Sequence, residues 1–241
     1  MRPLTSLVEP TLFTNNSKEI SLLSELRKEI ASSDEVMLLV SFIKMTGLMP
    51  IYNNLKEFTN KGKKLRVITT TYIKATEYKA IEKLLELPNT SIKISYETNN
   101  QRLHAKAYIF KRENGFSTFY IGSSNLSKAA LVYGDEWNVK LTEKNSPLIF
   151  KDVISEFETY WNSYEYKTLN NTEEDKEKLK IALSYKTENT NYYQNLMTFK
   201  PYDYQEKILE KLEVERQIYH RYRNLVVAAT GVGKTVLAAF D

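Results

Sequence analysis

The sequence of 241 residues contains no cysteine. This absence excludes disulfides, thiolate catalysis and zinc sites built on thiolates, and it is typical of proteins from the reducing cytoplasm. No apolar run approaches the ~20 residues of a membrane-spanning helix, and the first residues lack the apolar core of a secretory signal. We therefore expect a cytoplasmic protein with no membrane partner.

A strong excess of either charge is also missing. The chain has 34 lysine and arginine residues against 30 acidic ones, for a net charge of +4. Such a balance permits a polyanionic partner without requiring one. With 42% hydrophobic and 27% charged residues, the composition is that of an ordinary soluble globular protein. Its length suits one sizeable domain with an additional segment, or two small domains.

Apolar patterning predicts alternating strands and helices over the first two thirds of the chain. Strands are expected at 35–43, 65–70, 91–96, 103–110, 118–122 and 137–141. Helices are expected at 17–31, with Ser17 as N-cap, and at 50–58, 76–87, 126–132 and 147–161. Together they indicate an α/β domain at 1–166, in which helices flank a central mixed sheet.

The remainder of the sequence differs in character. Residues 167–198 are rich in charged and polar side chains and are expected to form a linker with one short helix. Residues 199–241 are expected to form a third segment. It has a helix at 204–221 and a strand at 224–228 that leads into a glycine-containing loop.

Histidine is scarce, and one of the two histidines lies in a suggestive context. His104 is followed by Lys106 on an expected strand, where side chains two residues apart face the same side. An imidazole with a near-neutral pKa can act as a nucleophile or as an acid, and a lysine supplies positive charge to phosphate oxygens. The pair predicts a site that reacts with a phosphodiester.

Groups further along the chain extend this site. The next strand ends in Gly122, Ser123 and Asn125. The glycine allows close backbone approach, and the amide of Asn125, expected at the mouth of a helix, provides a hydrogen-bond donor beside free N–H groups. Glu136 follows that helix and is placed to hold the second nitrogen of an imidazole. Each feature alone is common on protein surfaces, and the ordered combination favours a functional site.

The stretches 102–110, 120–127 and 136–139 resemble the phospholipase D superfamily, and most closely its single-motif nuclease branch. The resemblance implies the phospholipase D-like fold and metal-independent cleavage through a covalent phosphohistidine. In that mechanism His104 attacks phosphorus, Lys106, Ser123 and Asn125 hold the non-bridging oxygens, and Glu136 orients a histidine. An aspartate common in the superfamily is replaced by Lys111, which disfavours a lipid hydrolase.

The number of histidines also leads to a prediction about assembly. Two-step phosphoryl transfer needs a nucleophile and an acid for the leaving oxygen. His220 lies on an expected arginine-rich helix and is interpreted as a surface residue. We therefore expect the second imidazole to be His104 of another copy, in a homodimer with both motifs lining one groove.

A second phosphate-binding pattern lies near the end of the sequence. An apolar strand precedes a loop whose backbone would cradle phosphates, with a lysine for the β- and γ-phosphates and a threonine for Mg²⁺. The residues expected to bind ATP in this way are Gly231, Gly233, Lys234 and Thr235. Ala228 replaces the first glycine of the general pattern. Together with Phe199, Pro201-Tyr202 and Gln205, which would contact the adenine, it resembles the start of a superfamily-two helicase.

Only six residues follow Thr235, with no acidic box for magnesium and no second helicase lobe. We expect no ATP hydrolysis by this chain and interpret it as the truncated N-terminal part of a nuclease–helicase. ATP and Mg²⁺ are implied only for a complete helicase, and no cofactor is expected at the nuclease site.

The leading functional hypothesis is an endonuclease that acts on DNA or another nucleic acid, in a helicase-linked restriction or phage-defence protein. Two alternatives remain open: a catalytically idle DNA-binding or targeting module of a helicase, and a phospholipid phosphodiesterase.

Overall fold

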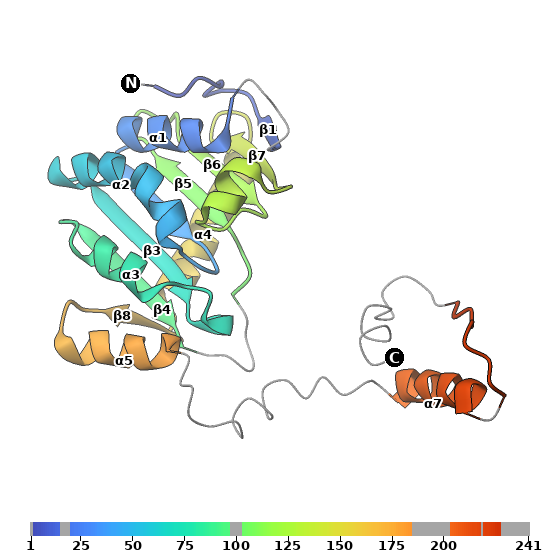
Figure 1. The fold of residues 1–241 in the computed structure, drawn as a ribbon. Helices are drawn as coiled ribbons and strands as arrows, with labels where there is room; N and C mark the ends of the chain where they lie inside the picture. The colour runs from blue at the N-terminus through green and yellow to red at the C-terminus, as the bar shows by residue number, and fades with distance from the viewer. Residues whose placement is uncertain (1, 15–19, 97–102, 185–202, 218, 228–241) are drawn as a thin grey trace. The chain divides into compact units, whose positions relative to one another are not determined.

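A computed structural model describes residues 2–14, 20–96, 103–184, 203–217 and 219–227. The chain divides into two compact units, Met1–Tyr185 and Lys186–Asp241. The first unit contains an eight-stranded mixed sheet flanked by helices (Figure 1), which confirms the predicted fold class. None of the helices in the described ranges is long and apolar enough to cross a lipid bilayer.

The sheet has the strand order β1-β7-β6-β5-β2-β3-β4-β8. Strands β2, β3 and β4 are parallel to one another, and every other neighbouring pair is antiparallel. The strands are β1 (Thr11–Thr14), β2 (Glu35–Leu39), β3 (Lys64–Thr70), β4 (Thr90–Ser95), β5 (Ala107–Lys111), β6 (Thr118–Gly122), β7 (Trp137–Thr142) and β8 (Tyr166–Leu169).

Helices cover both faces of the central strands (Figure 1). One face packs against α1 (Leu22–Ser32), α2 (Met45–Asn60), α3 (Tyr78–Leu85) and α5 (Glu173–Leu183), and the other against α4 (Pro147–Asn162). Successive β2 residues alternate between them: Val36 and Leu38 join the first core, whereas Met37 and Leu39 join the second. Burial on both sides explains why this strand is an almost unbroken apolar run.

Strand pairing brings three connecting segments to one edge of the sheet. Ala107, the first residue of β5, pairs with Leu39 at the end of β2 and with Ile121 near the end of β6. Gly122 pairs with Asn138 near the start of β7. The residues just before β5, just after β6 and just before β7 therefore share the edge at which β2 ends.

The N-termini of two helices differ from the predictions. Helix α1 begins at Leu22, where the Ser21 hydroxyl accepts the Ser24 N–H at 3.2 Å, and the predicted cap Ser17 lies outside the described residues. Helix α2 begins at Met45 and not at Pro50, so the proline lies inside the helix. The Met45 N–H donates to a carboxylate of the distant Glu77 at 2.8 Å, a tertiary contact that local sequence does not reveal.

Two elements beyond residue 166 pack within the first unit, although the linker was expected to start at 167. β8 pairs antiparallel with β4, and α5 buries Leu179 and Leu183 in the main core. The Thr172 hydroxyl caps α5 by accepting the Asp175 N–H at 3.3 Å. Because α5 is otherwise charged, its two buried leucines gave too weak a pattern to distinguish it from a solvated linker.

In the second unit, α7 spans Asp203–Gln217 and is shorter than the predicted helix at 204–221. His220 follows the helix instead of lying on it, and it is exposed, as expected, with a backbone φ of 52°. The described part of the predicted strand at 224–228 is irregular, which makes that prediction wrong for 224–227. The predicted ATP-binding residues at 231–235 lie outside the described ranges, and Gln205 is buried on α7.

Candidate active site

The His-x-Lys sequence does not lie on a strand, because β5 begins only at Ala107. His104 and Lys106 occupy irregular backbone immediately before it. The predicted strand at 103–110 therefore begins four residues late. Lys106 is 5% exposed and Leu103 is 6% exposed, whereas His104 is open to solvent. The segment thus anchors a buried lysine beside an accessible imidazole.

The two side chains of the motif are in contact. The Lys106 Nζ lies 3.0 Å from Nδ1 and 3.1 Å from Nε2 of His104, and it donates to the His104 carbonyl oxygen at 2.6 Å. A neutral imidazole has one acceptor nitrogen, so the ammonium donates to one ring nitrogen at a time. Burial lowers the pKa of Lys106, and the nearby carboxylate of Glu136 partly opposes that shift. The predicted juxtaposition is found, although irregular backbone and not strand alternation produces it.

Ser123 joins the end of β6 to the start of β7. Its N–H donates to the Trp137 carbonyl oxygen at 3.0 Å, and its hydroxyl accepts the Trp137 N–H at 3.1 Å. The Ser123 side chain is exposed at the sheet edge that also carries the motif.

Ser124 fixes the loop that follows β6, a role that the sequence did not suggest. Its hydroxyl accepts from the Asn138 side-chain amide at 2.8 Å and donates to the Ala130 carbonyl at 3.1 Å. The buried Tyr108 hydroxyl donates to the Ser124 carbonyl at 3.0 Å, and burial raises the pKa of Tyr108. At Gly122, a Cβ would lie 2.2 Å from the Trp137 carbonyl oxygen, so only glycine allows this approach.

Asn125 connects two loops that are far apart in sequence. Its Oδ1 accepts the Phe42 N–H at 3.1 Å, which ties the loop after β6 to the loop after β2. The side-chain Nδ2 has no hydrogen-bond partner in the described part of the chain, so it remains available as a donor. The predicted position at the mouth of a helix is wrong, because the following π-helix, η2 (Ala129–Tyr133), begins four residues later.

Glu136 is half-buried and lies between η2 and β7 in the sequence. Its carboxylate is close enough to Lys106 to oppose, in part, the lowering of the Lys106 pKa by burial. No hydrogen bond links Glu136 to His104 among the residues that can be described. The predicted role of this carboxylate in orienting a histidine is therefore not fulfilled by His104 of the same chain, and it stays a prediction.

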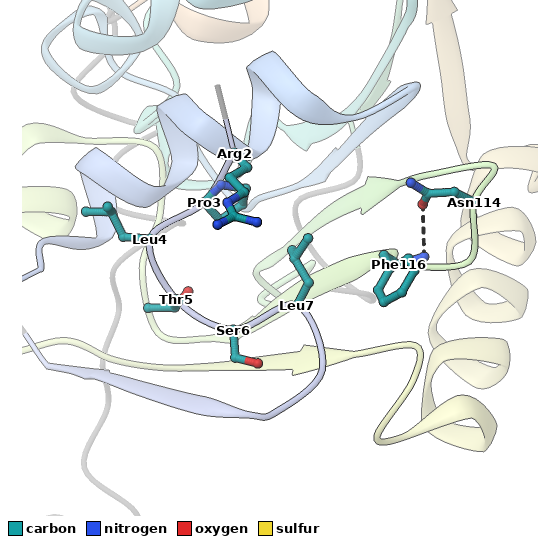
Figure 2. Close-up of a pocket in the computed structure, with 8 residues that line it drawn as sticks. All are labelled: Arg2, Pro3, Leu4, Thr5, Ser6, Leu7, Asn114 and Phe116. Atoms are coloured by element: carbon teal, nitrogen blue, oxygen red, sulfur yellow. Dashed lines mark hydrogen bonds between the residues drawn. The ribbon is translucent and has the colours of Figure 1, made fainter.

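A cavity of about 350 Å³ adjoins Asn125 on the η2 side. It is lined by Phe42, Lys44, Thr46, Asn125, Ser127, Ala129, Ala130, Tyr133 and Glu136. A larger cavity of about 630 Å³ lies at the opposite edge of the sheet, between residues 2–7 and the β5–β6 hairpin. Figure 2 shows that hairpin, with Asn114 accepting the Phe116 N–H at 3.2 Å. None of the predicted site residues lines the larger cavity.

The fold agrees with a comparison against protein families. Residues 26–161, more than half of the chain, match the family model described as cardiolipin synthase, PLD-like domain. The chain belongs to the phospholipase D-like family. A second match, over residues 198–241, is to the type III restriction enzyme res subunit, and it agrees with the resemblance of this segment to the start of a helicase. No curated protein matches the chain.

Solved structures share the phospholipase D-like fold. Nuc from Salmonella typhimurium, a phospholipase D family member, is 20% identical with a TM-score of 0.50, over 66% of this chain and 98% of that one. NucT from Helicobacter pylori is also 20% identical, with a TM-score of 0.47, over 62% of this chain and 94% of that one. At this identity the likeness to Nuc shows the fold alone.

Proposed function

We propose that this phospholipase D-like protein is a metal-independent endonuclease that cuts nucleic acid through a phosphohistidine on His104. The observation that carries the proposal is the buried Lys106 ammonium, 3.0 Å from the ring of an exposed imidazole. An accessible ring is open to a phosphodiester, and the ammonium beside it offers a fixed positive charge to the phosphate. The available Nδ2 of Asn125 at the same sheet edge adds a donor for a non-bridging oxygen.

In the proposed first step, one His104 nitrogen attacks phosphorus and the bond to the leaving oxygen breaks as the N–P bond forms. Lys106, Ser123 and Asn125 hold the non-bridging oxygens, and an acid protonates the leaving oxygen. In the second step, the conjugate base of that acid takes a proton from water, the water oxygen attacks phosphorus, the N–P bond breaks and the imidazole is regenerated. Positive charge and amide donors supply the stabilisation that a metal ion provides in other phosphodiesterases.

We further propose that the acid comes from a second copy of the chain. His104 is the one imidazole described in the first unit, and Glu136 makes no hydrogen bond to it. A homodimer that faces the two motifs across a twofold axis would provide both a nucleophile and an acid, with Glu136 orienting a histidine across the interface. Light scattering that finds only monomers at concentrations where the protein cleaves DNA would contradict this arrangement.

The similarity of residues 198–241 to a restriction-enzyme res subunit supports a link to an ATP-driven motor. We propose that the nuclease belongs to a cytoplasmic, helicase-linked restriction or phage-defence system with DNA as its partner. ATP and Mg²⁺ would bind at Gly231, Gly233, Lys234 and Thr235, with Gln205 near the adenine, in a complete helicase. DNA-stimulated ATP hydrolysis by the protein extended to a complete helicase would support this, and its absence would contradict it.

The central test is cleavage of a labelled oligonucleotide by the full chain in excess EDTA. His104→Ala is expected to reduce the rate by about 1,000-fold or more, because loss of the attacking group removes the covalent route. His220→Ala is the matched control and is expected to cleave normally. Binding without cleavage by the unmodified chain would favour the idle DNA-binding module, and cleavage of phospholipid alone would favour the lipid phosphodiesterase.

A further inference from the structure

The cavity beside Asn125 is lined in part by groups that the proposed phosphodiester chemistry does not use, namely Phe42, Lys44 and Tyr133. Its volume of about 350 Å³ lies in the range of small-molecule sites, ~300–1,000 Å³. The wall combines two aromatic rings, Phe42 and Tyr133, with the ammonium of Lys44 and the amide of Asn125. Rings and a cation next to a reacting phosphate are the groups that bind the base and backbone of a nucleotide.

Lys44 lies in the loop between β2 and α2 and, unlike Lys61 and Lys63, has no acidic partner among the described residues. Its Nζ lies 5.9 Å from the centroid of the Phe42 ring, and no ion pair involving Lys44 is found in the described ranges. Lys61 and Lys63, in contrast, pair with Glu57 and Asp34 at 2.9 and 3.1 Å. They also lie before β3, at the opposite edge of the sheet. Lys44 lines the cavity and is therefore placed to receive an anion there.

Tyr133 presents an aromatic surface to the same cavity. It is the last residue of η2 and is 66% exposed although it lines the cavity wall. The helix ends with the Gly134 N–H donating to the Ala129 carbonyl at 2.6 Å, a wide π-turn of the kind that is frequent at functional sites. An exposed ring on a hydrogen-bonded turn is a ready platform for stacking.

We propose that this cavity binds one unstacked nucleotide of the substrate, with its base against Tyr133 and its phosphate at Lys44. This inference rests on the proposed nuclease function and specifies its substrate class. In a duplex both faces of a base are covered by neighbouring bases, so a base can stack on Tyr133 only in a single-stranded segment. Every base has such a face, and the site therefore tolerates any sequence. Asn125 borders both this cavity and the phosphate site, which places the bound nucleotide next to the scissile bond.

The test measures binding to the His104→Ala variant of the whole 241-residue chain, where no cleavage interferes. The probes are a fluorescent oligothymidylate, an abasic oligomer with the same backbone, and a duplex. Tyr133→Ala is expected to weaken binding of oligothymidylate about fivefold or more, the lower end of one stacking contact, and to leave the abasic oligomer unaffected. Tyr133→Phe is expected to restore binding, because the ring is kept. Tyr164→Ala, an 82% exposed tyrosine beside β8 at the far side of the sheet, is the matched control.

Lys44→Ala is expected to weaken both single-stranded probes and to reduce the salt dependence of binding by about one phosphate contact. Lys61→Ala is the control at the opposite sheet edge. Failure of all probes to bind overturns the inference. So does equal weakening of the thymidylate and abasic oligomers by Tyr133→Ala, or a duplex that binds as tightly as the single strand. The EDTA cleavage assay is independent of these binding measurements. Failure of the proposed nuclease activity can therefore be distinguished from failure of the proposed nucleotide site.

Discussion

Glu29 is the centre of a buried charge network whose removal has a calculable cost. The Glu29 side chain is fully buried on α1 and accepts hydrogen bonds from Arg112, Lys140 and the hydroxyls of Thr118 and Tyr120, at 2.5 to 2.8 Å. It thereby ties the first helix to β6, to β7 and to the residue that follows β5. We predict that Glu29→Gln strongly destabilises the first unit.

The magnitude follows from the charges that would be left behind. Without the Glu29 carboxylate, Arg112 would have no ion pair among the described residues. Lys140 would keep one ion pair there, with Glu25 at 3.9 Å. Breaking a buried pair by removing one partner typically costs 3–5 kcal/mol. A whole domain is stable by ~5–15 kcal/mol, so this single amide substitution would remove a large share of that stability.

Urea unfolding at neutral pH, followed by tryptophan fluorescence, measures the effect. Both tryptophans of the chain, Trp137 and Trp161, lie in the first unit, so the signal reports on the relevant fold. Glu57→Gln is the control: its carboxylate is 70% exposed and pairs with an exposed lysine, a contact worth ~0–1 kcal/mol. A Glu29→Gln free energy of unfolding within about 1 kcal/mol of the control value would refute the reasoning.

Three further predictions concern pH, the motif lysine and the loop glycine. Burial raises the pKa of Glu29, but its two basic partners outweigh this and hold the pKa below the usual 4.5. The stabilisation is therefore present above pH 4.5 and lost as pH falls through the folded-state pKa, so urea midpoints of the unmodified protein and Glu29→Gln should converge in acid. Lys106→Met should abolish cleavage in EDTA yet keep or raise the thermal midpoint, because it removes a poorly solvated ammonium; a lower midpoint would contradict this. Gly122→Ala should lower the free energy of unfolding by roughly 1–3 kcal/mol through overpacking and reduce cleavage; an unchanged free energy of unfolding would contradict this.

The central strands could be predicted from sequence because burial on both faces leaves a continuous apolar run, as in β2. The outer strands could not. β1 and β8 span four residues each, too few for a clear alternation, and α5 buries only two leucines in a charged segment. The Glu29 network was also invisible, since its members come from separate elements and look like surface charges.

For the candidate site, the spacing was enough to predict that His104 and Lys106 lie together. It predicted a strand for these residues, whereas their backbone is irregular. The strand starts later than the apolar pattern indicated, and Lys106 reaches the ring from irregular chain. The contact between Asn125 and Phe42 spans 83 residues of sequence, so it depends on how the sheet assembles. The position of Tyr133 at the cavity could not be predicted from sequence either, because it depends on the π-helical turn at the end of η2.

The hydrogen bond from the Phe42 backbone to Asn125 has a consequence for substitutions around the candidate site. Asn125 joins the loop after β6, which leads to Tyr133, to the loop after β2, which carries Lys44. A change in the position of either loop would therefore affect the proposed contacts to the base and to the phosphate together. Because the donor is the Phe42 backbone, substitutions of Asn125 rather than of Phe42 are expected to uncouple the two loops.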